Sequence, residues 1–71
     1  MSVYKVIEIV GTSTQSWEDA ATSAVNTARE TLRDLRVAEV VKQDISIDES
    51  GSATYRTKLS ISFKYDSGAS Q

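Results

Sequence analysis

The chain contains no cysteine, no histidine and no proline among its 71 residues. The first absence excludes disulfides and thiolate metal sites, and the second excludes imidazole ligands and the commonest general base. A domain of this size buries only about 60% of the surface that its unfolded chain exposes, so its own core is marginal. The reinforcements that remain are association with further copies of the chain and an oxygen-ligated cation.

Concentrated positive charge and long apolar runs are also absent. The formal net charge is −2, and the eight basic residues are scattered from Lys5 to Lys64, whereas a nucleic-acid-binding surface gathers them on one face. No apolar run approaches the roughly 20 residues that a bilayer span requires. The first residues do not form a basic region followed by a long apolar segment, as a secretory signal does. These absences predict a cytoplasmic protein that binds neither nucleic acid nor a membrane.

The first half of the chain predicts a strand followed by a helix. Residues 3–10 are rich in β-branched side chains, and they are apolar on both faces of the expected strand. A strand with one solvent-exposed face should alternate apolar and polar residues more regularly. We therefore expect the helix to cover one face of this strand and a second subunit to cover the other. Ser16 is the expected N-cap of the helix, with Asp19 as the partner in an imperfect capping box. Apolar residues then recur at helical spacing as far as Leu35.

The second half predicts a β-hairpin. A strand of about ten residues is expected from Val37, and the polar residues 48–52 form the turn. Residues 53–65 alternate strictly and place Tyr55, Phe63 and Tyr65 on the apolar face, where packing is the expected role. The fold class is therefore α+β, in the order β-α-β-β, with a three-stranded antiparallel sheet of order 1-3-2 packed on one helix.

A single domain is expected over residues 1–71, with residues 66–71 as a disordered tail. Nothing in this sequence pairs a serine with a histidine, and no two carboxylates share an apolar face, so catalysis is not expected. Trp17, the only tryptophan, is expected to anchor the core or an interface rather than to stack on a ligand.

Four segments of the sequence together resemble the dodecin family over nearly the whole chain. They are VYKVIEIVGTS, SWEDAA, RVAEVV and TYRTKLSISFK. The resemblance implies a β-α-β-β protein of which twelve copies form a hollow shell, and it implies flavin binding between subunits in many members. The pattern is also similar to the branch of the family described as calcium dodecin. The expected function is thus a non-enzymatic homododecameric shell that binds or stores a small ligand.

The resemblance also identifies three positions of the flavin pocket: Val37, Gln43 and Arg56. Flavin-binding members carry a tryptophan at the position of Val37, where it stacks on the flavin ring, and a glutamine at the position of Arg56. Stacking contributes on the order of 1 kcal/mol beyond area burial, and valine has no aromatic face. Arginine donates hydrogen bonds but cannot accept them, so the two-way pairing of an amide is lost. Calcium is therefore favoured over flavin (riboflavin or FMN), and a purely structural or protein-docking assembly remains a third hypothesis.

A calcium ion requires 6–8 oxygen ligands at about 2.3–2.6 Å. The candidate ligands are Glu8, Asp44, Asp48 and Glu49, although no EF-hand loop is present. The competing interpretation is that Asp48 caps the hairpin turn while Asp44 and Glu49 are solvated. Symmetry can also bring several copies of Glu8, Glu18 or Asp44 together at an axis, where they form a ring that one chain does not contain.

Overall fold

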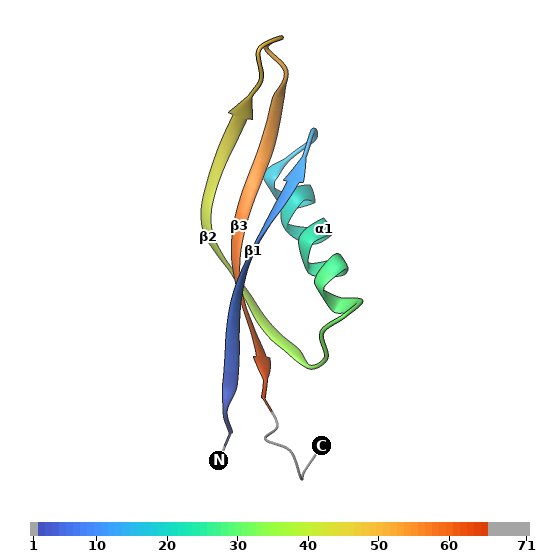
Figure 1. Cartoon of the computed structure of the whole chain (residues 1–71), viewed down its shortest axis with the longest axis vertical. Coiled ribbons are helices and arrows are strands. Elements are labelled where there is room, and N and C mark those ends of the chain that lie inside the picture. Colours follow the sequence, from blue (N-terminus) through green and yellow to red (C-terminus); the bar gives the residue numbers. More distant parts are fainter. Residues whose placement is uncertain (1, 66–71) are drawn as a thin grey trace.

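The computed structural model describes residues 2–65, so the expected tail at 66–71 lies outside the described residues. The strands pair antiparallel in the order β1-β3-β2, which confirms the predicted topology. In Figure 1 the helix covers one face of a twisted sheet, and the β2–β3 hairpin extends beyond the helix. The four elements are β1 (Tyr4–Ser13), α1 (Trp17–Arg29), β2 (Leu35–Ile47) and β3 (Ala53–Lys64).

The start of the helix is fixed by two serines. Ser16 is the N-cap, as predicted, and its Oγ accepts a hydrogen bond from the Asp19 backbone N–H at 2.9 Å. The Asp19 carboxylate does not return to Ser16, as a capping box would require. It accepts instead from the Ser13 hydroxyl at 2.7 Å, and the Ser13 Oγ itself accepts from the Gln15 N–H at 2.9 Å. The end of β1 is thereby tied to the first turn of α1.

The predicted end of the helix is wrong. We expected helical packing as far as Leu35 and a strand from Val37, but α1 ends at Arg29 and β2 already begins at Leu35. Leu32 and Leu35 still pack against the core cluster, so their apolar spacing continues after the helix has ended. Asp34, in the left-handed region at φ 60°, turns the chain into β2.

The core lies between α1 and the middle of β3 and is small. Its fully or nearly buried apolar side chains are Ala20, Ala24, Ala28, Leu59 and Ile61. The three alanines let the helix approach the sheet closely. Gly11 on β1 has no side chain and leaves room for the helix backbone at this point. A Cβ added at Gly11 would lie 2.1 Å from the carbonyl oxygen of Ala20.

The helix leaves much apolar surface of the sheet uncovered. It packs mainly on β1 and β3 and contacts β2 little. On the opposite face, Val6 and Val10 of β1 are 58% and 54% exposed, and Val37 of β2 is 60% exposed. Ile47, near the tip of the hairpin, is 70% exposed. The apolar character of both faces of the first strand is thus present in the fold.

The molecule is elongated. Its principal extents are 53 × 20 × 17 Å and its radius of gyration is 14.7 Å, whereas a compact domain of this length has a radius of gyration near 11 Å. Within residues 2–65, no helix is long and apolar enough to cross a membrane. A long sheet with one short helix provides few places where a side chain is shielded on all sides.

Candidate functional site

A bidentate ion pair joins β2 to β3. Asp44 and Arg56 are direct partners in the antiparallel ladder, so their side chains emerge on the same face of the sheet. The Arg56 Nε donates to Asp44 Oδ1 at 2.7 Å, and its Nη2 donates to Asp44 Oδ2 at 2.9 Å. This bidentate geometry engages both carboxylate oxygens. These hydrogen bonds lower the pKa of Asp44 and raise the pKa of Arg56.

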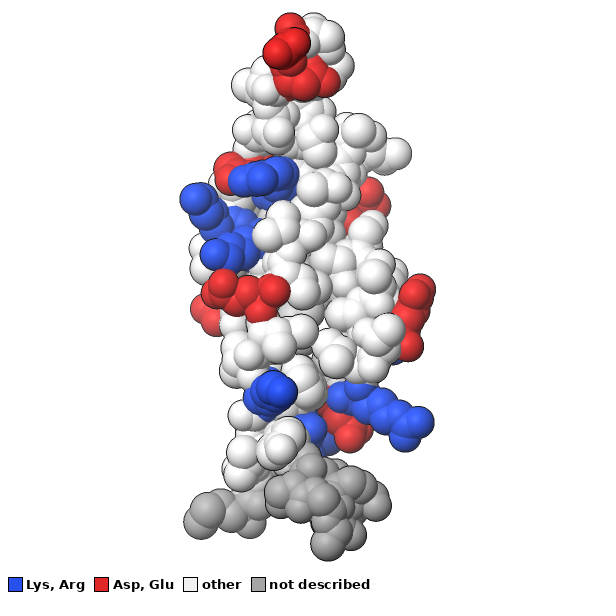
Figure 2. Space-filling view, viewed as in Figure 1, with Lys and Arg blue, Asp and Glu red and all other residues white. Residues whose placement is uncertain are grey.

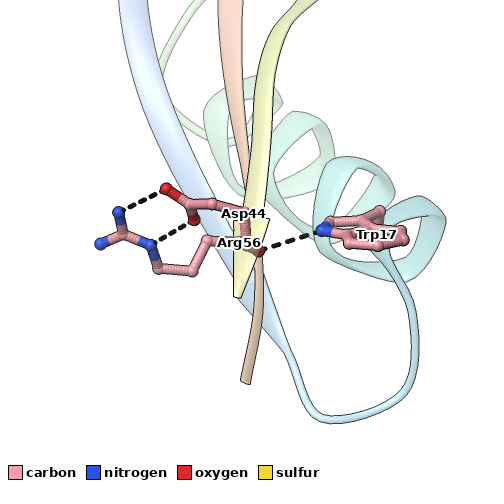
Figure 3. Close-up of polar contacts among 3 residues, drawn as sticks. All are labelled: Trp17, Asp44 and Arg56. Atoms are coloured by element: carbon pink, nitrogen blue, oxygen red, sulfur yellow. Dashed lines mark hydrogen bonds and ion pairs between the residues drawn. The ribbon is translucent and has the colours of Figure 1, made fainter. Parts of the chain in front are cut away.

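The backbone of Asp44 is held from the other side of the sheet. The indole Nε1 of Trp17 donates to the Asp44 carbonyl oxygen at 3.0 Å, and Figure 3 shows Trp17 on the helix side of the strand and the ion pair on the opposite side. The Trp17 ring also meets Tyr55 edge to face, with centroids 5.1 Å apart. Trp17 therefore has the anchoring role expected from the sequence, and it fixes the strand position from which the Asp44 side chain projects.

Basic side chains surround the ion pair. A hollow of about 190 Å³ on this face is lined by Val10, Lys42, Asp44, Arg56 and Lys58. Lys58 also forms an ion pair with Glu8 of β1, with Nζ and Oε1 3.3 Å apart. Figure 2 shows acidic and basic side chains in small separate groups on the side that it presents, without a continuous field of one sign.

A third candidate calcium ligand, Asp48, lies in the hairpin turn and is hydrogen-bonded within it. The Asp48 Oδ1 accepts from the backbone N–H of Ser50 at 3.0 Å, from the Ser50 hydroxyl at 2.7 Å and from the backbone N–H of Ser52 at 2.9 Å. These hydrogen bonds lower the pKa of Asp48, with the Ser50 side chain as the largest cause. Asp48 thus caps the turn, as the competing interpretation proposed. Asp44, which the same interpretation left solvated, has a side chain that is 34% exposed and that pairs with Arg56.

The four candidate cation ligands do not converge within one protomer. Glu8 pairs with Lys58, Asp44 pairs with Arg56, and Asp48 is turned inward at the hairpin, where Glu49 is exposed. Within residues 2–65, no group of three or more acidic side chains could hold a metal ion. Carboxylate oxygens are the correct donors for calcium, but one protomer provides too few of them in one place.

The three positions of the implied flavin pocket are likewise separated within one protomer. Val37 pairs with Ser62 and therefore shares the face of Arg56, several residues away along β3. Gln43 pairs with Thr57, so its side chain emerges on the helix face. The register of the β2–β3 ladder shifts between Val40 and Lys42, and this irregularity places Val37 and Gln43 on opposite faces, although simple alternation would place them together.

Sequence reasoning missed three features of this region. Neither the pairing of Lys58 with Glu8 nor the approach of Lys42 to the hollow was expected. The pairing of Asp44 with Arg56 was also missed, but a signal for it existed. Asp44 precedes the predicted turn 48–52 by as many residues as Arg56 follows it, so a regular hairpin places the two opposite each other.

Comparisons with known proteins point to the same family over nearly the whole chain. A family model described as Dodecin matches residues 3–66. A relative named calcium dodecin, from Mycobacterium tuberculosis, is 58% identical over 64 residues, which cover 90% of each chain. A dodecin from Thermus thermophilus is 39% identical over 64 residues, which cover 90% of this chain and 93% of the relative.

The similarity extends to three dimensions. The crystal structure of calcium dodecin from Mycobacterium tuberculosis, described as calcium chelating and as having a novel calcium-binding site, matches this fold with a TM-score of 0.85 at 54% identity. The match covers 94% of this chain and 96% of that one. A dodecin from Streptomyces coelicolor matches with a TM-score of 0.85 at 31% identity, covering 94% of this chain and 96% of that one.

Proposed function

This chain belongs to the dodecin family, and from that premise we propose that it is a non-enzymatic homododecameric shell that binds a small ligand, with calcium as the favoured ligand. The observation that carries the proposal is the apolar surface that the single helix leaves uncovered on both faces of the sheet. Contiguous exposed apolar surface is typical of an interface. Further copies of the chain are the simplest means of covering it, because the family resemblance implies a closed assembly of identical subunits.

The preference for calcium rests on two further points. The relative that is 58% identical is named calcium dodecin, and Val37 provides no aromatic ring for flavin stacking. Because the acids of one protomer are dispersed among β1, β2 and the hairpin turn, we expect the coordination shell to combine oxygens from more than one copy. The candidate contributors are Glu8, Asp44, Asp48 and Glu49.

Native mass spectrometry tests the assembly. We expect one dominant species at twelve times the protomer mass of 7.8 kDa. Analytical ultracentrifugation over a wide range of protein concentration provides an independent check. A stable monomer at micromolar concentration would contradict the proposal, because the uncovered valines and isoleucines would then be exposed to water in the working form of the protein.

Calcium binding is tested by thermal unfolding of the assembly in millimolar calcium against the same buffer with a chelator. A ligand that binds only the folded state at 100 times its Kd stabilises that state by about 2.7 kcal/mol. Magnesium is the matched control, since it prefers a stricter octahedral shell and releases its water reluctantly. Equal melting temperatures in calcium and in chelator would exclude calcium as the ligand. Quenching of riboflavin or FMN fluorescence by the same assembly would favour the flavin alternative instead.

A further inference from the structure

The side of the sheet away from α1 carries the alternate residues of β3. Leu59 and Ile61 are buried under the helix, so Lys58, Ser60 and Ser62 point to the other side. Their partners in β1 and β2 share this side, because directly opposed residues of an antiparallel ladder lie on the same face. The side chains of this outer face therefore form rows that cross all three strands.

Two neighbouring rows of the outer face carry opposite charge. In the acidic row, Ser60 lies between Glu8 of β1 and Glu39 of β2. In the basic row, two residues away along β3, Lys58 pairs with Lys42 of β2. On the side away from the helix, at the left of Figure 2, basic and acidic groups lie next to each other along the long axis. Each row carries one sign, and the sign changes from one row to the next.

Two of these four charges have no partner within the protomer. Glu8 and Lys58 form an ion pair with each other, with Oε1 and Nζ 3.3 Å apart. Glu39 and Lys42 take part in neither of the ion pairs found among residues 2–65, and both side chains are exposed. The outer face thus presents one unpaired acid and one unpaired base on the same strand.

Valines accompany these charges. Val6 and Val37 flank Ser62 in the row beyond the acidic one, and Val10 lies in the basic row. All three valines are more than half exposed, as is typical of a surface that another protein covers. A partner that covers them also removes Glu39 and Lys42 from water, so it has to provide a base for one and an acid for the other. A second copy of the same face provides both.

The rows determine how the second copy can lie. Contacts in a two-fold interface are reciprocal. A two-fold axis parallel to the strands keeps each row opposite itself and sets Glu8 of one copy against Glu39 of the other. An axis across the strands at either row also opposes like charges. An axis across the strands at Leu59, between the two rows, sets Glu39 of each copy against Lys42 of the other.

We infer that the outer face of the sheet is a two-fold interface between copies of this chain, in which Glu39 of each copy pairs with Lys42 of the other. The inference rests on the proposed homo-oligomeric shell and specifies one of its interfaces. A charge pair that is shielded beside the valines is screened less than an exposed one. Like charges brought together there are costly, so the two pairs select the register in which the sheets stack.

Charge reversal tests the pairing. Glu39→Lys and Lys42→Glu, made singly in the full chain, each oppose like charges at both contacts of the interface. We expect each to dissociate at a protein concentration about tenfold higher than the parent does, measured by analytical ultracentrifugation, with circular dichroism as the check on folding. The variant with both reversals in one chain restores both contacts and the net charge of −2. It should assemble as the parent does.

A mixture of the two single variants separates contacts between chains from contacts within one. When the two variants are refolded together from urea in equal amounts, the reversed side chain of one chain meets the reversed side chain of the other. The two unreversed side chains meet as well, so both contacts join opposite charges. Native mass spectrometry should then detect assemblies that contain both chains, with the concentration dependence of the parent.

Glu30→Lys is the matched control. It changes the net charge as Glu39→Lys does, but Glu30 is the exposed C-cap of α1, where a basic residue suits the helix dipole. This variant should assemble as the parent does. Combined with Lys42→Glu, it restores the net charge without restoring the contact, so the combination should remain as impaired as Lys42→Glu alone.

Four results would overturn the inference with a parent that still assembles. They are parent-like assembly of both single variants, failure of the double reversal to fold or assemble, equal rescue of Lys42→Glu by Glu30→Lys, and rescue by the double reversal without rescue by the mixture. The last result would mean that the two side chains interact within one chain. The double reversal decides the question if a single variant does not fold. A monomeric parent would contradict the proposed function and the inference together.

Discussion

Gly11 is the position where sheet and helix approach most closely, so Gly11→Ala tests the packing on which the fold depends. An added Cβ would lie 2.1 Å from the carbonyl oxygen of Ala20 and 2.8 Å from the Cβ of Ala24. The nearest neighbour belongs to the helix backbone, which no side-chain rotation can move away. The helix and β1 must therefore separate by about 1 Å before alanine can fit.

The expected loss of stability is about 3 kcal/mol. Overpacking typically costs about 1–3 kcal/mol, and the upper value applies because the obstacle is backbone. The separation also loosens the contact of Ala24 with the small cluster around Leu59 and Ile61. For a chain of this length we expect the melting temperature to fall by roughly 10 °C or more. Urea unfolding, monitored by tryptophan fluorescence, measures the loss when both proteins are compared at the same protein concentration, since the apparent stability of an oligomer depends on concentration.

Gly51→Ala is the matched control, because it adds the same methyl group at a different kind of glycine. Gly51 has a φ of +90°, but no atom lies within 4 Å of the added Cβ. Left-handed backbone costs an alanine roughly 1–2 kcal/mol, and the hairpin tip lies far from the core. Wild-type stability of Gly11→Ala, or a larger loss at Gly51 than at Gly11, would refute the close packing of α1 on β1.

Three further predictions concern the buried strand and the hairpin turn. Leu59→Ala should lower the free energy of unfolding by about 2–5 kcal/mol in urea unfolding, because Leu59 is 1% exposed and the cavity lies in the centre of a small core. Thr57→Val should cost about 1 kcal/mol, since it removes the hydrogen bond from the Thr57 hydroxyl to the Trp17 carbonyl oxygen at 3.0 Å. Asp48→Ala should destabilise the protein at neutral pH, and the difference should vanish in strong acid.

Each of these predictions has its own control. Ile61→Val removes one methyl group from the same core and should cost less than Leu59→Ala. Thr57→Ser retains the hydroxyl, so equal losses for serine and valine would show that the methyl group matters rather than the hydrogen bond. Ser46→Ala changes a β2 residue near Asp48 and should leave the pH dependence of stability unchanged.

The direction of the pH effect follows from the pKa of Asp48. Hydrogen bonds from Ser50 and Ser52 lower this pKa in the folded protein below 3.8, the ordinary value of an aspartate. The contribution of Asp48 to stability is therefore complete above 3.8 and is lost as the pH falls through the lower folded value. Unfolding experiments at a series of acidic pH values should show the parent approaching Asp48→Ala. A constant difference down to the lowest pH would mean that the charge of Asp48 does not stabilise the turn.

The fold could be predicted because its signals are local. Alternation over residues 53–65, the N-cap at Ser16 and the polar turn at 48–52 each depend on neighbours in sequence. The end of the helix was placed too late because Leu32 and Leu35 pack on the core without being helical. Apolar spacing reports which side chains are covered, and it does not distinguish the last helical turn from a loop that follows the same surface.

The candidate site was predicted less well, because it depends on strand register. Asp44 and Arg56 lie between the turn and the first irregularity of the hairpin, where the ladder is regular and their pairing can be counted from the sequence. Val37 lies between the two register shifts, at Leu35/Val37 and Val40/Lys42, so one shift separates it from Asp44. Each shift moves the following side chains to the other face. Apolar and polar residues alternate too weakly in β2 to reveal where such a shift occurs.

Asp44 joins all three neighbouring elements of its region. Its carboxylate binds Arg56 of β3, its backbone belongs to β2, and its carbonyl oxygen accepts the Trp17 indole at the start of α1. A change at Asp44 therefore affects a strand position that also anchors the start of the helix. Because Trp17 is the only tryptophan of the sequence, its fluorescence reports on this strand position and on the start of the helix together.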